Sequence, residues 1–236
     1  MRLGRWLYED VYSPWNRRRA FKASCRRLRR VGPEILKKAH AICTEEGIPY
    51  FIDYGTLIGC VREHGFIPHD NDIDLGILPG SAEPATVVRL LKHLMAEGFE
   101  FKRAFYYKGL ITEVACFYKR VSVDFFFNFP EGERFWTNYY ETDMDVPAPE
   151  HREFVEGIIR TYRPAIPALE PTTMVGAEVM IPANYEEVLV AHYGRGWRVP
   201  DPKWGESREG ESNARVRIPP EGEVIGWDVL CGLAKA

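Results

Sequence analysis

The stretch YFIDYGTLIGCVREHGFIPHDNDIDLGI, residues 50–77, decides the fold because it ends in a strand that carries two acidic side chains. In its last segment, DIDLGI, the apolar residues alternate with the others, which is typical of a strand with one buried face. Asp72 and Asp74 share the opposite face. Two carboxylates therefore stand side by side on a strand whose other face is suited to a core.

Neighbouring anions repel, and their burial is unfavourable unless a cation lies close to them. A single divalent cation would offset both charges. Because carboxylate oxygens are hard ligands, and no His or Cys accompanies them at ligand spacing, the pattern favours Mg²⁺ or Mn²⁺ over zinc. His64 and His69 flank the segment. We interpret them as loop residues or substrate contacts.

A third carboxylate lies in the run VSVDFFF, residues 121–127, which is otherwise suited to burial. An isolated aspartate in such a strand needs a partner. If this strand neighbours the first, then Asp72, Asp74 and Asp124 converge on one or two metal ions that bridge a phosphate. Metal-assisted phosphoryl or nucleotidyl transfer uses such an arrangement.

Upstream of the aspartates, Gly55 and Thr56 predict a turn in which backbone N–H groups approach a phosphate, followed by a short helix that ends near Arg62. The guanidinium of Arg62 can form two parallel hydrogen bonds to phosphate oxygens. Asp70 is grouped with these three residues as a contact of the bound donor.

Each of these features also has a plain structural interpretation. An Asp-x-Asp pair can simply lie on the surface of a strand, and a Gly-Thr pair can form an ordinary turn. A buried aspartate can accept hydrogen bonds from the backbone, and an arginine can form a salt bridge. Their occurrence together and in this order favours the functional interpretation. The aromatic residues Trp136, Tyr139 and Tyr140 leave two alternatives open, an acceptor pocket that stacks on sugars or a part of the core.

The rest of the chain alternates helical and strand-like segments, which predicts an α/β (α+β) fold with a mixed β-sheet flanked by helices. Helices are expected from Pro14 to Arg30, from Pro33 to Gly47 and after Pro84, and Lys108-Gly109 is expected to join two of three aromatic-rich strands. We divide the chain into a basic helical segment (1–32), a core (33–145) and a C-terminal helical and loop elaboration (146–236), whose end is expected to wrap the surface.

The charge is distributed unevenly along the 236 residues. Residues 1–38 carry twelve Lys or Arg and three acidic residues, about +9, so the remainder carries about −12 of the net −3. A basic helix in residues 1–30 fits peripheral contact with an anionic membrane, or simply a solvated helix packed by one stripe. The acidic remainder opposes a broad nucleic-acid footprint.

The same sequence has no run of about 18 apolar residues and no apolar signal core, so we expect a cytoplasmic protein, either free or peripheral at the inner face of the membrane. Five cysteines are scattered without a close pair. This spacing predicts reduced thiols.

The segment GTLIGCVREHGFIPHDNDIDLGI closely resembles the signature of the LicD and fukutin-related family, in which G-T-L-L-G precedes V-R and then G-F-I-P-W-D-D-D-I-D. The later segment VMIPANYEEVLVAHYGRGWRVPDPKW resembles the closing motif of that family. The resemblance runs from about Pro33 to about Trp204. His69 and Asn71 replace the usual tryptophan and middle aspartate, whereas Asp70 is in place.

The resemblance implies a nucleotidyltransferase-like fold, with Gly55 and Thr56 in the turn, Asp72 and Asp74 as the metal pair and Asp124 as the third carboxylate. It also implies transfer of a phospho-alcohol, such as phosphocholine or a polyol phosphate, from a CDP-alcohol donor to a glycan or lipid-linked oligosaccharide, with release of CMP. Transfer of NMP from an NTP to a small molecule or protein, and a non-catalytic binding module, are the alternatives.

Overall fold

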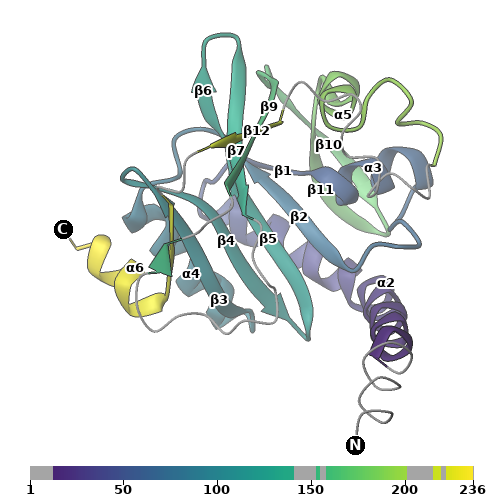
Figure 1. Cartoon of the computed structure of the whole chain (residues 1–236), viewed down its shortest axis with the longest axis horizontal. Coiled ribbons are helices and arrows are strands. Elements are labelled where there is room, and N and C mark those ends of the chain that lie inside the picture. Colours follow the sequence, from purple (N-terminus) through teal and green to yellow (C-terminus); the bar gives the residue numbers. More distant parts are fainter. Residues whose placement is uncertain (1–12, 141–152, 155–157, 201–214, 219–221, 236) are drawn as a thin grey trace, which may run out of the picture.

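The computed structural model describes residues 13–140, 153–154, 158–200, 215–218 and 222–235, and its elements are drawn in Figure 1. They are α2 (Ser13–Glu45), β1 (Tyr50–Ile52), α3 (Tyr54–Ile58), the π-helical turn η2 (Gly59–Glu63), β2 (Asp72–Ile77), α4 (Pro84–Ala96), β3 (Glu100–Tyr107), β4 (Leu110–Tyr118), β5 (Val121–Phe127), β6 (Phe129–Glu131), β7 (Arg134–Tyr140), β8 (Glu153–Phe154), β9 (Ile158–Pro164), β10 (Leu169–Met174), β11 (Ala177–Pro182), α5 (Tyr185–Tyr193), β12 (Arg215–Ile218), β13 (Gly222–Ile225) and α6 (Trp227–Leu233).

A mixed sheet forms the centre of the molecule. Within the described residues it has seven strands in the order β1-β2-β5-β4-β3-β13-β8. β2 and β5 run parallel, and the other neighbours are antiparallel. Two-residue turns with positive φ close the β3–β4 hairpin at Lys108-Gly109 and the β4–β5 hairpin at Lys119-Arg120. The expected mixed α/β sheet and the Lys108-Gly109 turn are confirmed.

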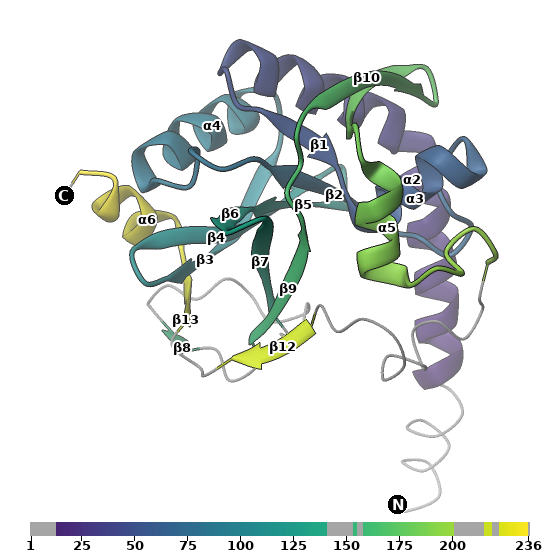
Figure 2. The same cartoon turned by 90° about the horizontal axis from the view of Figure 1, so that it is seen from above.

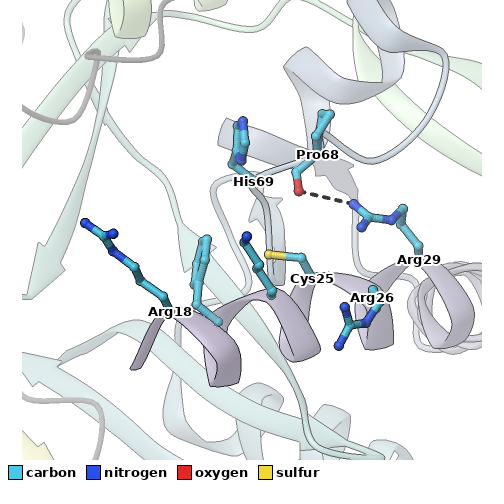
Figure 3. Close-up of a pocket in the computed structure, with 8 residues that line it drawn as sticks. Arg18, Cys25, Arg26, Arg29, Pro68 and His69 are labelled. Atoms are coloured by element: carbon cyan, nitrogen blue, oxygen red, sulfur yellow. Dashed lines mark hydrogen bonds between the residues drawn. The ribbon is translucent and has the colours of Figure 1, made fainter. Parts of the chain in front are cut away.

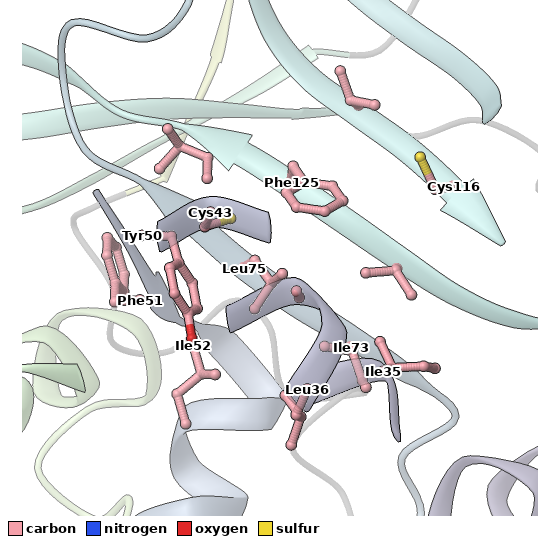
Figure 4. Packing of buried hydrophobic residues seen from close by; sticks show 14 of the residues in the cluster. Ile35, Leu36, Cys43, Tyr50, Phe51, Ile52, Ile73, Leu75, Cys116 and Phe125 are labelled. Atoms are coloured by element: carbon pink, nitrogen blue, oxygen red, sulfur yellow. The ribbon is translucent and has the colours of Figure 1, made fainter. Parts of the chain in front are cut away.

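Helices α2 and α4 cover one face of this sheet, and the smaller strands β7, β9 and β12 lie on the other side (Figure 2). The alternating apolar residues Ile73, Leu75 and Ile77 of β2 and Val121, Val123, Phe125 and Phe127 of β5 point toward the helices and are almost completely buried. Phe126 is the exception, because it shares the face of Asp124 and packs on Tyr54. Figure 4 shows Ile73 and Leu75 of β2 and Phe125 of β5 packed with Ile35 and Leu36 of α2. The alternation read from the sequence therefore separates a dry face from a polar one.

Helix α2 differs from the expectation of two helices, because it continues without a break through Pro33. Its buried stripe includes Leu28 before the proline and Ile35 after it. This continuous packing outweighs the local preference of proline to end a helix. Gly32 allows the ring of Phe66 to pack closely against α2, because a Cβ at this position would lie 2.3 Å from that ring.

The C-terminal part also differs from the expectation of a surface wrap. β13 pairs with β3 and so extends the central sheet, while β12 joins β9, β7 and β6 in a second sheet. β12 (RVRI) does alternate, but it and β13 (GEVI) are only four residues long and lie in a Pro- and Gly-rich region, so the sequence alone does not identify them as strands. All five cysteines are unpaired, as expected. In the part of the chain that the structure describes, no helix is long and apolar enough to span a bilayer.

Val175 occupies an unfavourable position at the tip of the β10–β11 hairpin. Its φ is 47°, and the following Gly176 has a φ of 79°, so the pair forms the kind of two-residue turn in which Asn-Gly is preferred. A β-branched residue in this region is strained. We expect Val175→Asn to raise the free energy of unfolding in urea by about 1 kcal/mol.

Val190, on helix α5, is the matched control because it has the same 37% exposure as Val175. An asparagine there relieves no backbone strain, so Val190→Asn should not stabilise the protein. Equal effects of the two substitutions would show that the turn at Val175 is unstrained.

Candidate metal centre

Three carboxylates meet on the polar face of the central sheet. Asp74 lies opposite Asp124 in the parallel β2–β5 register, and Asp72 lies two residues before Asp74 on the same face. One oxygen from each of the three side chains lies within 4.8 Å of the others. The structure therefore brings together the three aspartates that the sequence pattern selected.

The negative charge of this cluster is only partly compensated. Asp124 accepts a hydrogen bond from Ser122 Oγ at 3.1 Å, whereas its Oδ1 is buried and has no hydrogen bond from the described residues. Burial, followed by the charge of Asp72, raises the pKa of Asp124 to about 7. The pKa of Asp74 is raised well above its usual range, by burial first and then by the neighbouring carboxylates. Hard oxygen ligands with unbalanced charge fit a divalent cation such as Mg²⁺ or Mn²⁺.

Asp70 adds a fourth carboxylate at the edge of the cluster. Its Oδ1 accepts the N–H of Asn71 at 3.1 Å, and its Oδ2 is buried without a hydrogen bond from the described residues. Burial and then repulsion by Asp72 raise its pKa to about 8. A Cβ on Gly55 would stand 2.7 Å from Oδ2 of Asp70. Gly55 therefore makes room for this carboxylate.

Gly55 and Thr56 do not form the expected turn, because they lie in the first turn of helix α3. Asp53 caps this helix by accepting the N–H of Tyr54 at 2.9 Å, so the N-terminus already faces a carboxylate. The fully buried hydroxyl of Thr56 accepts the N–H of Asp74 at 3.0 Å. The hydroxyl of Thr56 thus holds the backbone of Asp74, one of the three clustered aspartates.

A buried ion pair beneath the cluster was not predicted. Arg163 of β9 donates from Nη1 to Oδ2 of Asp53, and both side chains are fully buried. The guanidinium carbon lies 5.3 Å from the ring centroid of Tyr54. The pair ties the second sheet to the start of α3. No local pattern in the sequence of β9 distinguishes Arg163 from a surface arginine.

Arg62 is held by groups outside the carboxylate cluster. Its Nε donates to Glu63 at 2.8 Å, and its Nη1 donates to the carbonyl of Trp197 at 2.9 Å. Arg62 therefore joins η2 to the C-terminal part. Its role as a phosphate clamp stays a prediction.

Lys102 and Arg103 of β3 reach the polar face of the sheet because of a β-bulge, which the sequence alone does not predict. Phe101 pairs with Cys116 and Arg103 with Ala115, so β3 has one more residue, Lys102, than β4 at this point. Ala115 in turn pairs with Asp124. Such a bulge redirects side chains and is common beside active sites. Both Lys102 and Arg103 act to lower the pKa of Asp124, although burial outweighs them.

The aromatic residues mostly belong to the core. Tyr140 is buried, stacks on Phe105 at a centroid distance of 3.9 Å and bonds Thr112. Trp136 stacks on Phe129 and carries the guanidinium of Arg160 at 3.8 Å from its ring centroid. These contacts favour the core interpretation over a sugar-stacking surface for both residues.

The hydroxyl of Thr56 can be tested by substitution. Thr56→Val leaves the N–H of Asp74 without its acceptor in a buried site, so we expect the free energy of unfolding to fall by about 1–3 kcal/mol. Thr56→Ser keeps the hydroxyl and serves as the control. Urea denaturation checks the difference, and equal stabilities of the Val and Ser variants would exclude the hydrogen bond as a support of Asp74.

The raised pKa of Asp124 predicts a pH dependence of stability in metal-free buffer. Between the unfolded pKa near 4 and the folded pKa of about 7, the folded chain keeps a proton that the unfolded chain has lost. Folding therefore binds a proton, and the free energy of unfolding should fall as the pH rises through this interval. Below it the contribution is constant. Asp70, Asp74 and Glu113 also have raised pKa values, so Asp124→Asn should make the profile recorded by urea unfolding from pH 4 to pH 8 less steep without removing it. An unchanged slope in that variant would contradict the assignment.

Residues 47–184 match the profile of a family described as LicD/FKTN/FKRP, nucleotidyltransferase domain. Ribitol-5-phosphate transferase FKTN of Mus musculus is 24% identical over 180 residues, which make up 75% of this chain and 35% of the relative. The human protein of that name is 23% identical over 211 residues, 87% of this chain and 41% of the relative. Lipopolysaccharide cholinephosphotransferase LicD of Haemophilus influenzae is 44% identical over 54 residues, 23% of this chain and 20% of the relative.

This chain thus spans less than half the length of these relatives. The matched residues contain the three aspartates and the segment that carried the resemblance. Because the profile covers more than half of the sequence, the chain belongs to the LicD/FKTN/FKRP family.

Proposed function

We propose that the chain is a metal-dependent phosphotransferase that moves a phospho-alcohol from a CDP-activated donor to a hydroxyl of a cell-surface glycan. The observation that carries this proposal is the cluster of Asp72, Asp74 and Asp124, whose oxygens lie within 4.8 Å of one another. The names of the relatives, a ribitol-5-phosphate transferase and a cholinephosphotransferase, support the phospho-alcohol as the transferred group.

The three aspartates would hold Mg²⁺ or Mn²⁺, which supplies positive charge to a bound diphosphate and polarises its phosphorus–oxygen bonds. The acceptor oxygen attacks the phosphorus that bears the alcohol, the bond from this phosphorus to the bridging oxygen breaks, and CMP leaves with that oxygen. Asp124, or the metal itself, would help to remove the proton of the acceptor hydroxyl.

Other residues orient these groups. Thr56 holds the backbone of Asp74 through its hydroxyl. Gly55 leaves space for Asp70, and we propose that both lie against the donor, together with Thr56 and Arg62. Lys102 and Arg103 approach the sheet face from the side of β3 and offset part of the negative charge of the bound diphosphate.

Nucleotidyl transfer from an NTP is the second candidate. The name of the matched domain supports it, and the same three carboxylates would serve the reaction. The two reactions differ in their products, because one releases CMP and the other pyrophosphate.

The setting of the reaction is part of the same proposal. A glycan or a lipid-linked oligosaccharide as acceptor, a cytoplasmic location and peripheral membrane contact through the basic residues 1–30 fit together, with no role for nucleic acid. Residues 1–12 lie outside the described part of the chain.

The test is a panel of CDP-choline, CDP-ribitol, CDP-glycerol, CTP and ATP, each incubated with Mg²⁺ or with EDTA, with CMP and pyrophosphate as the measured products. We expect CMP from a CDP-alcohol only when Mg²⁺ is present. Asp74→Asn should lower the rate by about a hundredfold or more, because even groups behind a metal ligand cost 10–100-fold when removed. Asp228→Asn, an exposed acidic residue on α6, is the matched control.

Undiminished CMP release by the Asp74→Asn variant would remove the metal centre from the mechanism. Pyrophosphate from CTP or ATP would favour nucleotidyl transfer instead. If none of the five compounds reacts and Mg²⁺ does not raise the thermal midpoint of the wild type relative to Asp74→Asn, the proposed enzyme function is wrong.

A further inference from the structure

A cavity of about 290 Å³ lies between the N-terminal half of α2 and the loop that leads to the aspartates. Figure 3 shows Arg18, Cys25, Arg26 and Arg29 of α2 on one side and His69 on the other. The volume is at the lower end of the range for small-molecule sites. The full lining is Arg18, Phe21, Lys22, Cys25, Arg26, Arg29, Pro68 and His69.

The positive charge of this cavity is not balanced by the described residues. Arg29 donates to the carbonyl of Pro68 at 3.2 Å, but Arg18, Lys22 and Arg26 form no hydrogen bond or ion pair within the described part of the chain. The lining contains no acidic residue. Four cations therefore face a space that offers them a single carbonyl partner.

This arrangement is unfavourable for the helix itself. Arg18, Lys22 and Arg26 are spaced at i, i+4 and i+8, where like charges destabilise a helix. An anion bound between them would offset this repulsion.

The cavity adjoins the metal centre. His69 directly precedes Asp70, and the charges of Asp70 and Asp72 reach Cys25 on the cavity wall, where they add to the effect of burial on its pKa. Cys25 is 3% exposed and Phe21 is 43% exposed. A ligand in the cavity thus meets the cationic side chains of α2, the buried Cys25 and the exposed ring of Phe21, and it lies beside His69, the residue that precedes Asp70.

We propose that this cavity is a second anion subsite, which binds a phosphate group carried by the substrate while the reacting diphosphate occupies the metal centre. The assignment to a substrate rests on the proposed function, whereas the binding of phosphate does not. Arginine is suited to phosphate because its guanidinium donates two parallel hydrogen bonds. A concave site bounded by Pro68 and His69 favours a discrete phosphate over a flat membrane surface.

The experiment titrates the full chain with inorganic pyrophosphate in EDTA, so that the metal-free carboxylates repel the probe and the cavity remains as its site. Amide chemical shifts are followed by NMR. We expect shifts in residues 18–29 and 68–69 of the wild type, and a dissociation constant raised on the order of tenfold or more in Lys22→Glu/Arg26→Glu. Arg30→Glu/Lys37→Glu reverses two exposed charges on the same helix outside the cavity and should bind like the wild type.

Vesicles of phosphatidylglycerol, compared with vesicles of phosphatidylcholine, distinguish the source of the phosphate. If pyrophosphate binds in the cavity, and binding of the chain to phosphatidylglycerol vesicles does not depend on Lys22 and Arg26, the phosphate belongs to a soluble substrate. If Lys22→Glu/Arg26→Glu loses both pyrophosphate binding and binding to phosphatidylglycerol vesicles, the phosphate is that of a lipid headgroup.

Two results would overturn the subsite. The first is pyrophosphate binding that is weakened equally in the cavity variant and in the control variant. The second is vesicle binding through Lys22 and Arg26 without any pyrophosphate shift in the cavity, which would make this face a membrane contact. Asp74→Asn should bind pyrophosphate like the wild type, so a failure of the proposed function leaves this result standing.

Discussion

The parallel register between β2 and β5 is the constraint on which the rest of the structure depends. It places Asp74 opposite Asp124 and directs the alternating apolar residues, such as Leu75 and Phe125, to the helices. A shift by one residue would turn Asp124 into the core and Val123 toward the polar face. The apolar cluster packed against α2 and the carboxylates on the opposite face of the sheet therefore require the same strand pairing. The site is thus a consequence of the fold.

The crowding of like charges on this face has to be tolerated by its surroundings. Neutral hydrogen bonds and one buried ion pair hold the backbone of the cluster: the hydroxyl of Thr56 fixes Asp74, and Arg163 fixes Asp53 at the start of α3. Breaking such an ion pair leaves an uncompensated buried charge, which is strongly destabilising. Because Arg163 comes from β9 and β13 extends the central sheet, the C-terminal part is needed to complete the region around the site.

The sequence predicted the parts of the site that follow from local alternation. The pattern DIDLGI fixes which face holds Asp72 and Asp74, and a lone aspartate in VSVDFFF signals a partner on a neighbouring strand. It could not predict features that depend on distant packing. Pro33 lies inside α2 because a buried stripe continues across it. The bulge at Lys102 and the partner of Arg163 arise from strand register and from a contact 110 residues away.

Two unbalanced charges of opposite sign lie on either side of the loop that holds His69. The carboxylates would be neutralised by the cations of α2 if they touched, yet Arg18, Lys22 and Arg26 form no ion pair with any described residue. The fold keeps the two groups apart, while burial and then the charge of Asp72 raise the pKa values of Asp70 and Asp124. A ligand that satisfies both must be positive toward the aspartates and negative toward the helix. A phosphate compound chelated to a divalent cation has this polarity, so the charge distribution of the chain favours a metal-bound phosphate substrate over a metal or an anion alone.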